Sequence, residues 1–135
     1  MAWIEPKINW MESDYFNTED YNRIIGNITH LKALADTLFA SLASLSMGEE
    51  KTYLSDIYAR EMNNIEDSLD TLNKETYGLG IGDKQTFRAN GSTPLWSEYN
   101  RIESAILMLY KTLVAHKESL PRLEFKLGGQ KGIRV

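Results

Sequence analysis

Apolar residues recur along this chain in alternating steps of three and four, and they do so in three separate stretches. The stripes consist of Tyr21, Ile24, Ile28, Leu31, Ala35, Leu38 and Leu42; of Met62, Ile65, Leu69 and Leu72; and of Tyr99, Ile102, Ile106, Leu109 and Leu113. This spacing gathers apolar side chains on one face of an α-helix. The pattern predicts three helices, over residues 18–42, 57–74 and 94–118.

The apolar stripes are wider than a two-helix contact requires. Ile25, Leu34 and Phe39 broaden the first stripe, and Ala105 and Met108 broaden the third. A helix with a wide apolar face buries it against two neighbours rather than one. The predicted fold is therefore mainly α, a three-helix bundle.

The three predicted helices begin with related sequences. The copies read Tyr21-Asn22-Arg23-Ile24, Met62-Asn63-Asn64-Ile65 and Tyr99-Asn100-Arg101-Ile102, preceded by Asp20, Glu61 and Glu98. The shared register predicts equivalent, internal positions for the three isoleucines.

The polar residues of these copies are candidates for a network between helices: Asn22, Arg23, Asn63, Asn100, Arg101 and Glu103. A partly buried amide must find partners, and bonds to neighbouring helix ends would fix the register of the copies. The alternative is that the asparagines are exposed and reflect only the ancestry of the repeat. Glu66 and Glu103 fall at equivalent positions and could form a carboxylate pair, but repeated surface acids are the favoured interpretation.

The two ends of the chain depart from the helical pattern. Residues 1–16 are expected to form an extended N-terminal arm, and Pro121 is expected to end the third helix because its ring disfavours helix at Leu120. Beyond it, apolar and charged residues alternate around a Gly128-Gly129 turn, which predicts a β-hairpin over 121–135. One domain of 135 residues would thus comprise the arm, a bundle over 17–120 and the hairpin.

Composition narrows the class of protein. The chain has no cysteine, no apolar run long enough to span a membrane and no signal-peptide pattern at its start, so we expect a protein made in the cytoplasm without membrane insertion. The net charge is −4, of which the part from Lys111 onward carries +4 and the preceding part −8. This asymmetry favours a complementary protein surface over nucleic acid, although a solvated basic tail remains the alternative.

Catalytic and ligand-binding motifs are not evident in the sequence. His30 and His116 lie in different predicted helices, and neither has an acid or a histidine four residues away, as a metal site on a helix would need. The glycines between Gly78 and Gly82 lack the lysine and the strand context of a phosphate loop. No serine lies in a nucleophile motif. The sequence predicts a protein that is not an enzyme and has no cofactor or metal.

With these residues in view, the chain resembles small structural proteins from the tail-gene modules of phages and prophages of Gram-positive bacteria. The resemblance rests on Trp10, on Asp14-Tyr15-Phe16-Asn17-Thr18-Glu19-Asp20-Tyr21-Asn22-Arg23-Ile24, on Asn63-Asn64-Ile65-Glu66 and on Trp96-Ser97-Glu98-Tyr99-Asn100-Arg101-Ile102-Glu103. The first copy departs from the pattern, because Ile25 and Gly26 replace the acid that follows in the other two. Gly26 could mark a close helix crossing.

The resemblance implies a non-enzymatic virion component of the tail, baseplate or fibre attachment point. Such an adaptor would act as a homo-oligomer that also binds other phage tail proteins. The interface candidates are the apolar residues of the two ends: Trp3, Ile4, Ile8, Trp10, Leu123, Phe125, Leu127, Ile133 and Val135. The alternative is a receptor- or carbohydrate-binding tail tip, in which Trp3, Trp10 and Trp96 stack on sugars.

Overall fold

Three helices make up most of the described chain. The computed structural model describes residues 3–45, 59–87 and 96–129, with the backbone alone at 59 and 121–129. The helices are α1 (Thr18–Asp36), α2 (Ala59–Glu75) and α3 (Trp96–Gly129), and the described residues contain no strand. The prediction of a mainly helical fold with three helices is confirmed.

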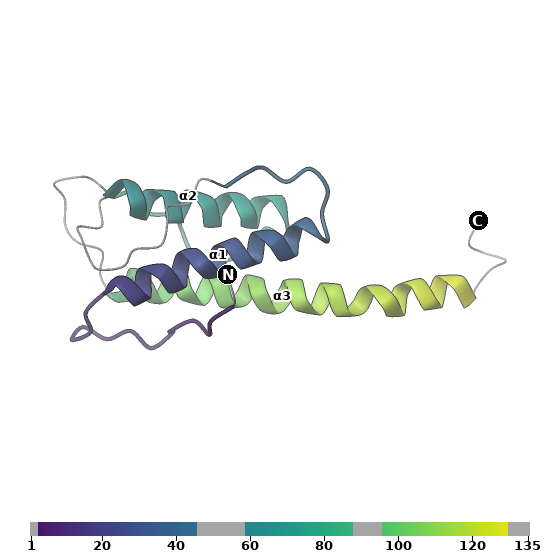
Figure 1. Ribbon diagram of the computed structural model, residues 1–135, viewed down its shortest axis with the longest axis horizontal. Coiled ribbons are helices and arrows are strands. Elements are labelled where there is room, and N and C mark those ends of the chain that lie inside the picture. The colour runs from purple at the N-terminus through teal and green to yellow at the C-terminus, as the bar shows by residue number, and fades with distance from the viewer. Residues whose placement is uncertain (1–2, 46–58, 88–95, 130–135) are drawn as a thin grey trace.

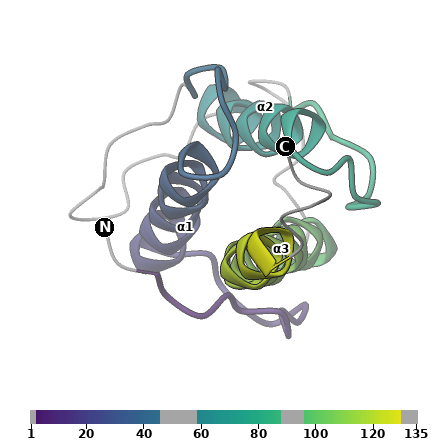
Figure 2. The same cartoon turned by 90° about the vertical axis from the view of Figure 1, so that its right-hand side faces the viewer.

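The helices pack side by side around one apolar core (Figure 1). Seen along the long axis, the three helices surround a common centre, and the N-terminal segment runs past the gap between α1 and α3 (Figure 2). Ile24, Ile65 and Ile102 are all buried in this core, as the shared register predicts. We call α1, α2 and residues 96–116 of α3 the helical body.

The first helix begins at a strong local signal. The Asn17 side chain accepts a hydrogen bond from the backbone N–H of Asp20, and the Asp20 carboxylate accepts one from the backbone N–H of Asn17. This reciprocal capping satisfies two backbone donors that the helix cannot satisfy itself. The acids Glu19 and Asp20 also favour the positive end of the helix dipole.

The first helix ends earlier than its apolar stripe. Prediction placed its end at residue 42, but α1 stops at Asp36, where the backbone N–H of Thr37 turns back to the carbonyl of Leu34. Ser41 has a φ of 60°, a left-handed conformation through which an α-helix cannot continue. Leu38 and Leu42 still pack on the core from this turn, so their place in the stripe reflects burial rather than helix.

The predicted C-terminal hairpin is wrong for the residues that the structure describes. Helix α3 does not end at Pro121 but continues to Gly129, so Leu123, Phe125 and Leu127 are helical. Ile133 and Val135 lie outside the described residues. The apolar steps from Leu113 through His116, Leu120 and Leu123 to Leu127 fit a helix as well as residues 123–127 fit a strand. Extending an existing helix needs no new nucleus, which favours the helical solution.

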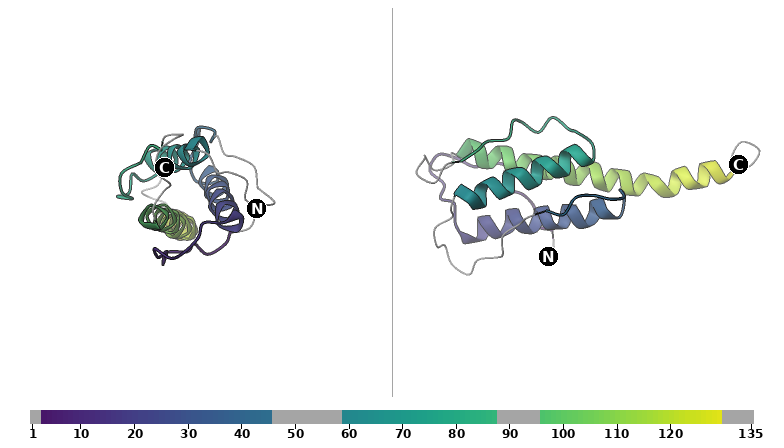
Figure 3. Two further views of the ribbon diagram at one scale, coloured as in Figure 1. Left: turned by 90° about the vertical axis from the view of Figure 1, so that its left-hand side faces the viewer. Right: turned by 90° about the horizontal axis from the view of Figure 1, so that it is seen from above.

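The third helix is longer than the other two, and its C-terminal part projects beyond them (Figure 3). None of the described helices combines the length and the apolar character that crossing a membrane requires.

Candidate functional site

Two buried arginine–glutamate pairs join the helices near their starts. Arg23 of α1 donates from Nε to Glu103 Oε1 at 2.8 Å and from Nη2 to Glu103 Oε2 at 2.7 Å. Arg101 of α3 makes the same two-pronged contact with Glu66 of α2, with Nη1 at 3.0 Å from Oε1 and Nη2 on Oε2. The exposed fraction is 2% for Glu66 and 0% for Glu103. The interpretation of these acids as surface residues is therefore wrong.

The acids that precede two of the copies hold the same arginines. Asp20 lies 2.9 Å from Arg23 and Glu98 lies 2.9 Å from Arg101, each three residues before its arginine. The planar guanidinium can donate to both carboxylates at once, which a lysine could not do in the same geometry. Each arginine is thereby held by an acid of its own helix as well as by the glutamate of a second helix.

These pairs follow a cyclic order. The arginine of α1 binds the glutamate of α3, and the arginine of α3 binds the glutamate of α2, at matching repeat positions. The third junction, from α2 to α1, would pair position 64 with position 25, and these residues are Asn64 and Ile25. The departure of the first copy from the pattern thus coincides with the one junction that lacks an ion pair at these positions.

Burial and pairing oppose each other at Glu66. Burial raises the pKa of its carboxyl, and Arg101 lowers that pKa in part. For Arg101 the bonds to Glu66 and Glu98 outweigh the effect of burial, so the pKa of the guanidinium is raised. The charged state of the arginine is secured by its partners, and the carboxylate depends on Arg101 to remain charged inside the protein.

The repeated asparagines Asn63 and Asn100 hydrogen-bond to the backbone of extended segments rather than to helix ends. Asn100 accepts from the backbone N–H of Trp10 at 2.7 Å and donates to its carbonyl at 3.0 Å. Asn63 does the same with Phe87, at 2.7 Å and 2.9 Å. Asn22, the third member of the set, is half-buried in α1 and also has a partner. The predicted partner, a neighbouring helix end, is wrong for Asn63 and Asn100.

Two further asparagines outside the repeat form the same contact. Asn27 binds the N–H and carbonyl of Ile4, and Asn73 binds those of Leu79. We call the contacts of Asn27, Asn63, Asn73 and Asn100 the amide clamps. An amide side chain has one acceptor and one donor side, so it pairs with an extended residue as a neighbouring β-strand would.

The glutamates also take part in holding these segments. Glu103 accepts from the backbone N–H of Lys7 at 3.0 Å and from the indole N–H of Trp10 at 2.6 Å. The backbone of Gln85 also lowers the pKa of the Glu66 carboxyl. The Glu103 carboxylate therefore joins two helices and the extended segment that lies along them, which makes it the centre of its junction.

The N-terminal arm divides its side chains between core and surface. Trp10 is buried against Tyr99, and Trp3 stacks on Tyr110 with ring centroids 3.8 Å apart. Ile4 and Ile8, the other two interface candidates of the arm, point away from the core and are exposed.

No known protein family, curated protein or solved structure matches the chain. What the protein does must therefore be inferred from its own residues and geometry.

The two histidines lie in aromatic clusters. His116 Nδ1 is 2.8 Å from the Tyr77 hydroxyl, with Phe39 packed edge-on against the ring, while His30 lies beside Trp3 and Tyr110. Among the residues that the structure describes, no three His, Cys, Asp or Glu side chains gather closely enough to hold a metal ion.

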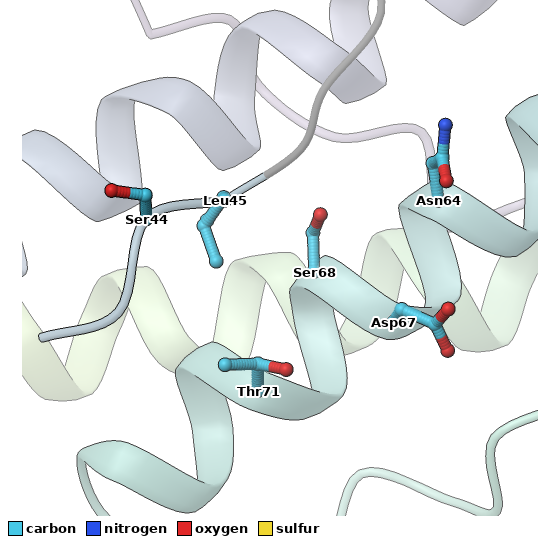
Figure 4. Close-up of a pocket in the computed structure, with 6 residues that line it drawn as sticks. All are labelled: Ser44, Leu45, Asn64, Asp67, Ser68 and Thr71. Atoms are coloured by element: carbon cyan, nitrogen blue, oxygen red, sulfur yellow. The ribbon is translucent and has the colours of Figure 1, made fainter.

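A shallow pocket of about 200 Å³ lies beside α2 (Figure 4). Its lining is mainly polar: Ser44, Leu45, Asn64, Asp67, Ser68 and Thr71. Asp67 is an exposed carboxylate that pairs with Lys84 at 3.0 Å. The hydroxyl groups have no histidine or lysine among the lining residues to activate them, so the lining supplies hydrogen bonds rather than a nucleophile with its base.

Glu66 is the member of the helix-joining network that sequence reasoning left out. Its signal was present, because it stands in the second copy where Glu103 stands in the third, directly after the repeated isoleucine. Asn27 and Asn73 had no such signal, since they lie outside the repeated positions and their partners are backbone groups.

Proposed function

We propose that this protein is a non-enzymatic structural component of a phage virion, at the tail, baseplate or fibre attachment point, where it binds copies of itself and other virion proteins. The observation that carries the proposal is the projection of α3 beyond the helical body, with an apolar register that continues from Leu113 through Leu120 to Leu127. A helix with such a register is normally covered by another element. The resemblance in the repeated helix starts gives the class of partner.

The internal network supports a structural role. The buried carboxylates of Glu66 and Glu103 are both held by arginine, Glu103 also accepts from the backbone N–H of Lys7, and the amide clamps fix extended segments on the helices. Such pairing stabilises one arrangement of the chain. A virion component benefits from it because its surfaces must meet many identical partners in one geometry.

Exposed apolar side chains supply the surface for assembly. They gather on the arm and include Ile4, Ile8, Met11 and Tyr15, with Trp96 and Met108 on α3. Rows of exposed apolar side chains are typical of surfaces that bind other proteins.

The test is made on particles of a phage or prophage that carries this gene. Mass spectrometry of purified virions should find the protein in a fixed ratio to other tail proteins, and deletion of the gene should give particles with incomplete tails. Complementation with the intact gene is the control. Particles that lack the protein yet have normal tails and infectivity would refute the proposal.

One observation favours the receptor-binding alternative. Trp96 is exposed at the start of α3, whereas Trp3 is stacked on Tyr110 and Trp10 is buried. A sugar could therefore stack on one of the three tryptophans in the described structure. Binding of the purified protein to host cell walls, abolished by Trp96→Ala and unchanged by Met108→Ala, would support this function over the adaptor.

A further inference from the structure

The apolar spacing of α3 continues beyond the part of the helix that packs on α1 and α2. Ile102, Ile106, Leu109 and Leu113 are buried in the helical body, and Leu120 is half-buried at the edge of it. At 1.5 Å per residue α3 is about 51 Å long, whereas α1 and α2 are about 28 Å and 26 Å. We call residues 117–129 the projecting end. Leu123 and Leu127 continue the register there.

A second uncovered apolar surface lies on the arm. Exposed fractions are 55% for Ile4, 52% for Ile8, 63% for Met11 and 89% for Tyr15. We call these four residues the arm strip. The backbone that carries the strip is fixed by Asn27, Glu103 and Asn100, so the strip is a firm surface rather than a loose chain end.

The two surfaces have opposite charge. The arm, residues 1–16, contains three acids and Lys7, a net charge of −2, and Glu5 and Glu12 are exposed beside the strip. The projecting end, residues 117–129, carries Lys117, Arg122 and Lys126 against Glu118 and Glu124, a net charge of +1. Opposite charge around apolar contacts steers two surfaces together and disfavours the pairing of like with like.

The arm strip and the projecting end of one molecule cannot meet. The arm runs along the earlier part of α3, with Trp3 on Tyr110 and Trp10 on Asn100. Leu120 and Leu127 lie about 15 Å and 26 Å farther along the helix than Tyr110, directed away from the arm. The contact has to form between two molecules.

We propose that the projecting end of α3 of one copy binds the arm strip of a second copy, head to tail. The proposal deepens the self-association in the proposed function and rests on it. Because the two surfaces differ, each bound copy leaves one of each kind free, and the assembly grows until it closes as a ring or extends as a filament.

Pairing of two projecting ends is the weaker solution. The part of α3 that projects, residues 117–129, spans about two heptads, and a stable coiled coil usually needs three or more. Two such ends would also bring together segments that each carry net positive charge.

Two complementary variants of the full chain test the proposal. An arm variant, Ile8→Asp with Met11→Asp, introduces charge at exposed positions of the strip, and an end variant, Leu123→Asp with Leu127→Asp, does so on the projecting end. Multi-angle light scattering should find the unaltered protein as a concentration-dependent oligomer and each variant alone as a monomer. An equimolar mixture should form a dimer that grows no further, because only one competent strip and one competent end remain.

The control is Ala33→Asp with Ala40→Asp, which adds the same charge at exposed positions outside both surfaces and should leave the oligomer unchanged. Circular dichroism checks that all variants are folded, and Glu5→Lys with Glu12→Lys replaces the arm variant if it is not. An arm variant that still dimerises, a mixture that stays monomeric, or an unaltered protein that is monomeric would overturn the head-to-tail contact. None of these outcomes decides whether the protein is found in virions, so the two proposals fail separately.

Discussion

At the scale of single residues, the most consequential feature is a carboxylate that is buried with one strong partner. Removing one member of a buried ion pair leaves the other charge uncompensated. We expect Arg101→Met to lower the free energy of unfolding by about 3–5 kcal/mol, because Glu66 then lacks its main partner. Urea denaturation measures the loss.

The matched control for this substitution is Arg60→Met, an exposed arginine at the start of α2, for which the change should stay within about 0.5 kcal/mol. The double variant Arg101→Met with Glu66→Met should recover much of the loss, since no buried charge remains. Equal effects of the two arginine substitutions would contradict the buried pair.

Two buried tyrosines should make the free energy of unfolding depend on pH in the alkaline range. Burial raises the pKa of Tyr21 to about 12, with Glu61 adding to the shift, and burial also raises the pKa of Tyr99 to about 12. A group with a raised folded pKa gives stability that is complete below its unfolded value of 10.0 and is lost as the pH rises toward 12. The unfolding free energy should therefore fall steeply above pH 10, as measured by urea titrations across that range.

Tyr99→Phe should make this decline shallower, because one of the two ionising hydroxyls is gone. Tyr15→Phe is the control, since Tyr15 is exposed. An unchanged slope in Tyr99→Phe would show that the buried hydroxyl does not drive the alkaline transition.

Residues of the network between the helices could be predicted from the sequence only where they occupy equivalent positions of the repeat. Arg23, Arg101 and Glu103 were found because three copies aligned the same positions. Glu66 and Glu103 were both interpreted as surface acids because charged residues usually are exposed, and the repeat alone does not reveal the arginine that compensates the burial of each. Asn27 was missed because its partner is the backbone of Ile4, which no side-chain pattern records.

At the scale of elements, the amide clamps attach extended segments to helices. We expect Asn63→Ala to lower the free energy of unfolding by about 1–3 kcal/mol, because it leaves the backbone groups of Phe87 without these bonds. Hydrogen exchange at the Phe87 amide should accelerate by more than the global loss of stability explains. Asn64→Ala, one residue away and part of the pocket lining, should leave that amide protected.

Helix starts were predictable to within about two residues where they are described, and two helix ends were not. The start of α1 has a local cause in the cap formed by Asn17 and Asp20. Its end depends on Ser41 and on the packing of Leu38 and Leu42 from a turn, which are tertiary effects. The continuation of α3 past Pro121 depends on the long helix that precedes it, which outweighs one missing N–H group.

At the scale of the whole molecule, folding and assembly should be separable. Among the side chains of α3 that the structure describes, residues 96–120, the last one buried in the core is Leu113, before the projecting end begins. Deleting residues 122–135 should change the free energy of unfolding by less than about 1 kcal/mol, since every core residue described for α3 is kept. Light scattering should show that the truncated protein stays monomeric at concentrations where the full chain assembles. A truncated protein that forms the same oligomers would contradict a role for this end.

The attachment of the arm to α3 also determines when the molecule can be completed. Trp10 is held by Asn100 and Glu103, which follow it by 90 and 93 residues. A ribosome adding roughly 5–20 residues per second makes the two sides of this contact about 5–20 s apart. The arm is thus synthesised well before the residues of α3 that hold it. Trp10 lacks these contacts until residues 100–103 have been synthesised, so a nascent chain cannot form the finished arm surface before its third helix exists.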